Sequence, residues 1–514
     1  MPEATVGIVL TLLIVTAFVA IAVRIIRIPY SIALVLVGGA LAFLPGIPDL
    51  VLSPGVILTL FLPVLLFHGA YHLDLAELRA NLLAVVSLAF PGVLLTAGLV
   101  GLALHLVAQL PWPTAFLFGA IVAATDPVAV LSLFGELGAP RRLATIVTGE
   151  SLFNDGTALV VFATLLSIIQ GEAVTPASIG LVVLIEVVGG IALGLGIGLI
   201  GSLVLARIND ALIETTITLV MAYGGFLLAT AIGSSGPLET VTAALMLGAR
   251  RQRAFSSATR LAAGATWEFL DFLANSFLFL LVGLQLRPIL VITQSGQNIA
   301  WEVVSAILAV IIARVIVVWL TMAWLAARHQ PLPPSWGVTF VWAGLRGAVS
   351  LAAALSLPLG YGDRSLVLVL TFAVVLFTLL VQGLTIRSIL LRFQVVAARA
   401  ASAFDLAWGR LTLLERGRQA IARLRAEQRI TPQVSERLDA EYGALIETQQ
   451  ATLAALVAQD TELVAAQEFL ARRAIFQAQR DALEEEALSG QLAPETLAVL
   501  LQEVDEQANQ LLEA

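Results

Sequence analysis

Residues 143–169 read LATIVTGESLFNDGTALVVFATLLSII, and this stretch decides how the chain is interpreted. It is long and apolar enough to cross a bilayer as one helix. Near its middle lie Glu150 and Asp155, with Ser151 and Asn154 between them. Because an ionised side chain at that depth costs about 2.5–3.5 kcal/mol or more, it usually has a partner or a function. The stretch therefore predicts a site for a proton or a small cation.

The rest of the chain is also strongly apolar. Of its 514 residues, 59% are hydrophobic and 12% are charged, and the mean hydropathy of +0.96 excludes a soluble globular protein. The absence of cysteine excludes disulfides and thiolate metal sites. The formal charge of −8 comes from residues 395–514, which hold 11 arginines against 19 acids, whereas the preceding residues hold 17 of each. We expect no nucleic-acid binding.

Apolar runs predict an all-α polytopic membrane protein with 13 transmembrane helices between residues 1 and 394. They are expected at 6–24, 30–45, 54–71, 83–108, 113–134, 143–169, 177–206, 211–232, 238–250, 266–286, 300–327, 335–357 and 365–391. Six helices, a linking seventh and six more would form a 6+1+6 inverted repeat.

Arginines alternate along this series of spans. Loops after odd-numbered spans carry 13 arginines, whereas loops after even-numbered spans carry only Arg287 and Arg364. By the positive-inside rule, the N-terminus is expected outside and the C-terminus in the cytoplasm. No basic residue precedes the first apolar run, which favours a retained first helix over a cleaved signal peptide.

The fifth and twelfth spans are expected to be discontinuous. The fifth contains Ala124-Thr-Asp-Pro127, where Pro127 removes a backbone donor, and the twelfth contains Gly344-Leu-Arg-Gly347. Interruptions at matching positions of two halves indicate a binding site near the midplane. Carbonyls freed by Pro127 and the Thr125 hydroxyl are candidate cation ligands. Asp126 is expected to neutralise the N-terminus of a half-helix rather than to bind the cation directly.

Asp155 is the strongest candidate for the proton and cation site. Ser151 lies one turn earlier on the same helix face and is a candidate ligand. The alternative for Asp155 is a carboxylate held permanently in a salt bridge. Asn154 is expected to hydrogen-bond across to another helix.

Two arginines lie deep in apolar spans and need anions. We expect Arg314 to pair with Glu150, since a guanidinium fork suits a carboxylate, with Arg346 as the alternative partner. Arg346 is otherwise expected to balance half-helix dipoles. His68 is either a hydrogen-bonded packing residue or a proton carrier.

Glu186, Glu268 and Asp271 are not expected in the site. Glu268 and Asp271 are placed near the start of the tenth span, close to the cytoplasmic surface.

The tail, residues 395–514, is rich in Ala, Leu, Glu, Gln and Arg at helical spacing. It predicts a cytosolic helical domain with a dimerisation or regulatory role. Pro432 and Pro494 predict helix starts, and Ser489-Gly490 predicts a break.

Four ordered blocks resemble the monovalent cation:proton antiporter family that includes bacterial NhaP-type proteins and animal sodium/proton exchangers. They are Ala123-Ala-Thr-Asp-Pro-Val-Ala-Val130, Gly149-Glu-Ser-Leu-Phe-Asn-Asp155, Phe279-Leu-Leu-Val-Gly-Leu284 and Trp342-Ala-Gly-Leu-Arg-Gly-Ala-Val-Ser350. The resemblance covers roughly residues 10–395.

The resemblance implies a homodimer in a bacterial plasma membrane, with crossed discontinuous helices in a mobile core. It implies that Asp155 binds cation and proton alternately, with Ser151 and Thr125 as further ligands. The Asn154-Asp155 pair resembles the electroneutral branch, and the Glu150–Arg314 pair is also typical of that branch. His68 is a departure, because relatives carry a carboxylate at that point of the third span.

We therefore expect a secondary active antiporter that exchanges Na⁺, with K⁺ or Li⁺ as alternatives, for H⁺ across the lipid bilayer. It would need no cofactor. A K⁺/H⁺ antiporter of the same fold is the first alternative and a cation channel the second, although no filter motif is present. An intramembrane enzyme is not expected, since no aspartic-dyad, serine–histidine or HExxH arrangement lies in the spans.

Overall fold

The computed structural model describes residues 2–26, 29–44, 57–171, 176–208, 210–254, 257–287, 299–393, 395–396 and 399–459, with single residues 55, 496 and 500. Within these ranges every regular element is a helix, so the all-α prediction is confirmed. The chain forms two compact units, residues 1–396 and 397–514.

The first unit is built from α-helices and two π-helical segments (η). In order they are α1 (Pro2–Ile26), α2 (Tyr30–Leu41), η1 (Ile57–Phe61), α4 (Leu62–His72), α5 (Leu75–Ala80), α6 (Leu82–Ala89), α7 (Pro91–Val107), α8 (Trp112–Ile121), α9 (Val128–Leu137), α10 (Arg141–Ile169), α11 (Pro176–Leu205), α12 (Ala211–Ala231), α13 (Gly236–Ala254), α14 (Ser257–Leu284), α16 (Ala300–Ala327), α17 (Pro334–Trp342), α18 (Ala348–Leu355), α19 (Arg364–Phe377), η2 (Thr378–Gln382) and α20 (Gly383–Arg392).

Seven helices in the described ranges are long and apolar enough to cross a membrane: Leu82–Val107, Arg141–Ile169, Leu184–Leu205, Ala211–Ala231, Ala263–Leu284, Ala300–Ala327 and Arg364–Arg392. Shorter apolar helices include Tyr30–Leu41, Ile57–His72 and Trp112–Ile121. A multi-pass membrane protein is therefore well supported. The count of 13 spans and the inverted repeat stay predictions.

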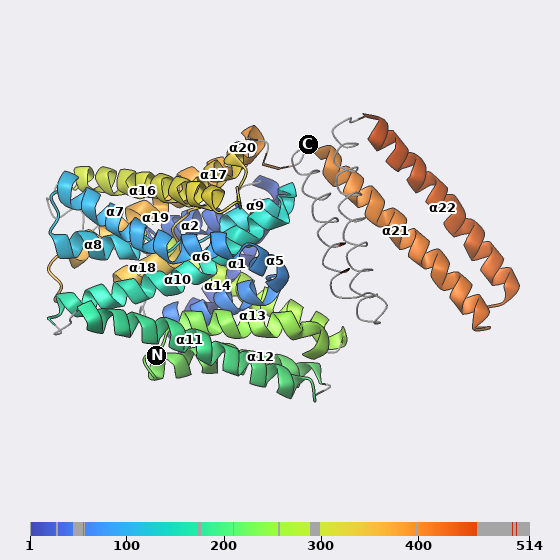
Figure 1. Cartoon of the computed structure of the whole chain (residues 1–514), viewed down its shortest axis with the longest axis horizontal. Coiled ribbons are helices and arrows are strands. Elements are labelled where there is room, and N and C mark those ends of the chain that lie inside the picture. The colour runs from blue at the N-terminus through green and yellow to red at the C-terminus, as the bar shows by residue number, and fades with distance from the viewer. Residues whose placement is uncertain are drawn as a thin grey trace. The chain divides into compact units, whose positions relative to one another are not determined.

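The helices of this unit pack as two groups. One group contains α2 packed on α14 and α4 packed on α13, with α11 and α12 beside α13. The other contains α7, α8, α10, α16, α18 and α19. Figure 1 shows α11, α12 and α13 side by side along one flank, and α16 with α7 along the opposite flank. α4, α14 and α10 lie where the groups meet.

Both expected helix interruptions are present. The chain is not helical between α8 and α9, at residues 122–127, and between α17 and α18, at residues 343–347. Pro127 is the residue before α9, where its missing N–H costs no hydrogen bond. The span expected at 83–108 is present as Leu82–Val107, with a local irregularity at Phe90 that separates α6 from α7, because Pro91 cannot donate to the preceding turn.

The expected start of the tenth span at residue 266 is wrong as a helix boundary. α14 begins at Ser257, so most of the expected loop before it is helix. A hydropathy profile locates the start of the apolar side chains. Ala-rich sequence such as Leu261-Ala-Ala-Gly-Ala265 also favours a helix, so α14 begins before the apolar run. Asp271 consequently lies in the middle of α14 rather than near its start.

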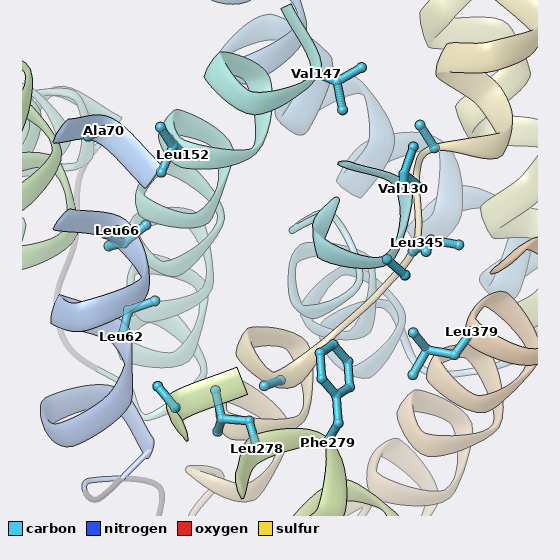
Figure 2. Packing of buried hydrophobic residues seen from close by; sticks show 14 of the residues in the cluster. Leu62, Leu66, Ala70, Val130, Val147, Leu152, Leu278, Phe279, Leu345 and Leu379 are labelled. Carbon is cyan, nitrogen blue, oxygen red and sulfur yellow. The ribbon is translucent and has the colours of Figure 1, made fainter. Parts of the chain in front are cut away.

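Apolar packing holds the two groups together around their junction. Figure 2 shows Leu62 and Leu66 along α4, Leu152 on α10, and Leu278 and Phe279 on α14. All five side chains are at least nine-tenths buried in one cluster. Burying such a side chain contributes about 1.5–3 kcal/mol, so these contacts fix the helices that carry the polar site.

The second unit contains a helical hairpin. α21 (Arg399–Ala426) and α22 (Pro432–Gln459) lie side by side (Figure 1), with Ala407, Leu411, Ile446 and Leu453 buried between them. α22 starts at Pro432 as expected. The features expected at Pro494 and Ser489-Gly490 lie outside the described residues, and the role of the tail stays a prediction.

Candidate functional site

The two interrupted helices meet at their extended segments. The Asp126 N–H donates to the Leu345 carbonyl over 2.8 Å, which joins the α8–α9 break to the α17–α18 break. Gly347 lies directly against the Asp126 side chain, and a β-carbon there would collide with it. Asp126 Oδ1 accepts from the Val128 N–H over 3.1 Å at the start of α9. This is the half-helix role expected for Asp126.

Arg346 fills the crossing from the α17–α18 side. Its side chain is almost completely buried, and Nη1 donates to the Ala124 carbonyl over 3.2 Å. The carbonyls just after α8 ends have lost their helical partners, so the guanidinium satisfies them and balances the negative end of the half-helix dipole. Arg346 therefore pairs with backbone rather than with Glu150.

Arg314 binds a backbone carbonyl near the end of α17, the first half of the other interrupted helix. From α16 it binds both carboxylate oxygens of Glu150 on α10, and Nε and Nη2 donate to the Phe340 carbonyl of α17 over 3.0 and 2.8 Å. Glu150 is only 2% exposed. The sequence prediction of a Glu150–Arg314 pair agrees with this geometry. The pair lies away from the cavity described below and ties three helices together.

Two polar side chains fasten α10 to the extended segment. Ser151 Oγ donates to the Thr125 carbonyl over 2.7 Å, and the Asn154 amide donates to the Thr125 hydroxyl. The Thr125 N–H in turn donates to Asn154 Oδ1 over 3.3 Å. Asn154 thus hydrogen-bonds to the break between α8 and α9, whereas the expected partner was another helix. The hydroxyl of Ser151 and the carbonyl of Thr125 are thus brought together.

A cavity of about 430 Å³ lies at this junction. It is lined by residues of five segments: Leu62, Leu65, Leu66, His68, Gly69 and His72; Ala124, Thr125, Asp126, Pro127, Val128, Leu131 and Ser132; Thr148, Ser151, Leu152 and Asp155; Asp271, Asn275, Leu278 and Phe279; and Gly347, Ala348, Val349 and Ser350. One water occupies about 30 Å³ in the liquid. The cavity is therefore larger than an alkali cation together with its inner shell of waters.

Asp155 lies on the wall of this cavity. It forms no ion pair with any residue that the structure describes, unlike Glu150 on the same helix. Among the charges that the structure describes, that of Asp126 acts on Asp155. A permanent salt bridge at Asp155 is thus excluded for the described residues.

His68 and Asp271 also line the cavity. His68 Nδ1 on α4 lies 3.3 Å from Asp271 Oδ1 on α14, and both side chains are about a quarter exposed. The expectation that Asp271 lies outside the site is wrong, because it rested on the misplaced start of α14. The sequence signal for this polar helix face, which the prediction did not use, is the spacing of Asp271 and Asn275 four positions apart. Glu268 is exposed and does not line the cavity.

The arrangement suits a hard monovalent cation. Asp155, Ser151 and Thr125 line one cavity with carboxylate, hydroxyl and carbonyl oxygens, and such cations prefer oxygen ligands. Among the described residues there is no cluster of three or more His, Cys, Asp or Glu side chains of the kind that holds a transition metal.

Comparison with known proteins assigns the family. Residues 9–392 match the family model described as sodium/hydrogen exchanger, transmembrane. The chain belongs to the sodium/hydrogen exchanger family. The match spans all the helices that form the cavity, so this exchanger carries its candidate site within the family's own region.

Individual relatives agree with this assignment. The exchanger is 40% identical over 383 residues to the Na⁺/H⁺ antiporter ApNhaP of Aphanothece halophytica, covering 73% of this chain and 71% of that protein. It is 38% identical over 372 residues to the low-affinity Na⁺/H⁺ antiporter NhaS1 of Synechocystis, covering 71% and 69%. The solved sodium proton antiporter MjNhaP1 of Methanocaldococcus jannaschii has a TM-score of 0.63 at 22% identity, covering 76% and 99%, which shows a shared fold.

Proposed function

We propose that this protein is a secondary active antiporter that exchanges Na⁺ for H⁺ across a membrane, one for one, by competition at Asp155. One observation carries the proposal: Asp155 is a carboxylate without an ion-pair partner among the described residues, and it lines the same cavity as Ser151 and Thr125. The family assignment and the names of the relatives support sodium as the cation.

Coupling follows from the charge of one carboxylate. An empty, ionised Asp155 is too costly to carry past the apolar layer formed by residues such as Leu152 and Phe279. A proton or a cation neutralises it, and only one of the two fits at a time. Each crossing therefore carries one ion, and the flux of one drives the flux of the other.

Rigid-body movement would supply alternating access. α7, α8, α10, α16, α18 and α19 would shift against the group of α2, α4, α11–α13 and α14, since the cavity lies between them. The cavity extends to His72 at the end of α4, the end that the arginine distribution assigns to the cytoplasm. This arrangement is thus the cytoplasm-facing one.

The proposal also covers the charge balance of the exchange, the oligomeric state and the orientation in the membrane. Asn154 is uncharged and engaged with Thr125, so it adds no second negative charge next to Asp155 on α10, which supports an electroneutral exchange. The family resemblance supports a homodimer in a bacterial plasma membrane, with the N-terminus outside and the C-terminus in the cytoplasm. No cofactor is required because the ion gradients supply the energy.

Purified protein in proteoliposomes tests the proposal. A preset pH gradient, followed with a pH-sensitive dye, should dissipate on addition of Na⁺ and be unaffected by an imposed membrane potential. Parallel additions of Li⁺ and K⁺ establish selectivity. Asp155→Asn should abolish the response, whereas Glu268→Gln, which removes an exposed carboxylate, should not.

The result also separates the alternatives. A response to K⁺ but not Na⁺ identifies a potassium/proton antiporter. Net current without proton movement identifies a channel. Full exchange by Asp155→Asn would refute the competition mechanism.

A further inference from the structure

The cavity has a second charged wall that the proposed exchange at Asp155 does not use. Asp271 is on α14, whereas Asp155 is on α10, and these helices belong to different packing groups. The Asp271 carboxylate lines the same cavity and is about a quarter exposed to it. An ionisable side chain in the middle of a membrane helix points to a function by default.

The partner of Asp271 does not neutralise the cavity. His68 Nδ1 lies 3.3 Å from Asp271 Oδ1, and His68 is held by its own helix, where its ring lies 4.5 Å from that of His72. Three aspartates and two histidines line the cavity, and no arginine of the described residues does. Among the ionisable side chains of the lining, acids therefore outnumber bases.

A negative cavity with apolar walls concentrates cations. Low-dielectric surroundings focus the field and raise the local concentration of counter-ions. Asp271 is near enough to Asp126 for their charges to interact, which places it within electrostatic reach of the crossing. Asn275, one turn further along α14, adds an amide to the same wall. α14 thus presents a polar stripe toward the crossing.

We propose that Asp271 is a second cation-binding carboxylate of this cavity, positioned by His68, and that it sets the apparent affinity for the monovalent cation without being needed for the exchange cycle. The inference rests on the proposed function at Asp155. Because α14 belongs to the group that does not carry Asp155, Asp271 holds the ion on its way to the site and does not cross with it.

A simpler role for the His68–Asp271 contact is a tie between α4 and α14. The two roles differ in what they change. A tie affects folding and leaves the affinity of folded protein unaltered, whereas a cation-binding carboxylate affects the KM and leaves the maximal rate unaltered.

The test compares the full-length wild type with Asp271→Asn in proteoliposomes, at one pH, over a series of Na⁺ concentrations. We expect the KM for Na⁺ to rise about tenfold while the maximal rate stays within about twofold. Glu268→Gln, on the same helix but outside the cavity, is the matched control and should leave both values unchanged. Asp271→Glu should restore most of the affinity.

Variants of His68 test positioning without altering Asp271. His68→Ala should raise the KM for Na⁺ by about threefold, because Asp271 loses its support. His68→Gln, whose amide is able to donate to the same oxygen, should behave like the wild type. An unchanged KM in both Asp271→Asn and His68→Ala would overturn the inference and leave the contact as a tie.

A binding measurement keeps this failure distinct from failure of the proposed function. Protection of detergent-purified protein against thermal unfolding by NaCl, over a choline chloride background, needs no transport. If the wild type is protected and Asp271→Asn requires the same Na⁺ concentration, the inference about Asp271 fails alone. If the wild type shows neither protection nor exchange, the proposed function fails and the inference fails with it.

Discussion

Glu150 and Asp155 lie on one helix but face different neighbours. Five positions correspond to about 140° around a helix axis, so the two carboxylates point to different sides of α10. Glu150 meets Arg314, while Asp155 reaches the cavity. Ser151, four positions before Asp155, shares its side and binds the Thr125 carbonyl. The motif thus separates a structural acid from a transport acid by helical phase alone.

Loss of Glu150 should destabilise the protein. In Glu150→Gln the Arg314 guanidinium stays buried without its counter-charge, a situation that costs about 3–5 kcal/mol. We expect a clearly lower unfolding temperature in detergent than for the wild type, measured by intrinsic fluorescence. Glu268→Gln removes an exposed carboxylate and serves as the control. Equal unfolding temperatures for the two variants would show that the ion pair contributes little.

The chemistry of single residues predicted the Glu150–Arg314 pair. It did not predict that Asp271 lines the cavity. A buried arginine needs an anion, which was enough to pair Arg314 with Glu150 from sequence. The position of Asp271 depends on where α14 begins and on how α14 packs against α4, and a hydropathy profile contains neither fact. His68 was ambiguous for the same reason, since its partner comes from a distant segment.

At the scale of elements, the crossing of two broken helices organises the site. Three of the four half-helix ends meet an opposite charge: Asp126 at the start of α9, Arg346 after the end of α8, and Arg314 at the end of α17. The breaks were predictable because Pro127 and the pair Gly344 and Gly347 interrupt helices. The hydrogen bond between Asp126 and Leu345 was not, because it joins two breaks distant in sequence.

A methyl group at Gly347 should disturb this crossing. In Gly347→Ala the new β-carbon meets the Asp126 side chain, so one extended segment must shift away from the other. Overpacking of this kind costs about 1–3 kcal/mol, and we expect Na⁺-driven exchange to fall at least tenfold. Gly135→Ala on α9 is the matched control, because nothing lies within 4 Å of a β-carbon there. Equal exchange by the two variants would show that the close approach is not required.

At the scale of the molecule, the cavity lies between two groups of helices, and its walls carry acids of different kinds. Asp155 and Asp126 belong to the group with the crossing, whereas Asp271 belongs to the other. Relative movement of the groups would therefore change which acids an ion meets. The all-helical class and the membrane location were predictable from composition. The grouping was not, because it depends on contacts between distant helices such as α2 and α14.

The central claim is that a proton and Na⁺ occupy Asp155 in turn. Initial rates of exchange in proteoliposomes, taken over a range of Na⁺ concentrations at a series of pH values equal on both sides, test it most directly. Competition predicts that the KM for Na⁺ rises as the pH falls, by up to about tenfold per pH unit, while the maximal rate at saturating Na⁺ stays constant. A KM independent of pH, with a maximal rate that falls in acid, would contradict the account.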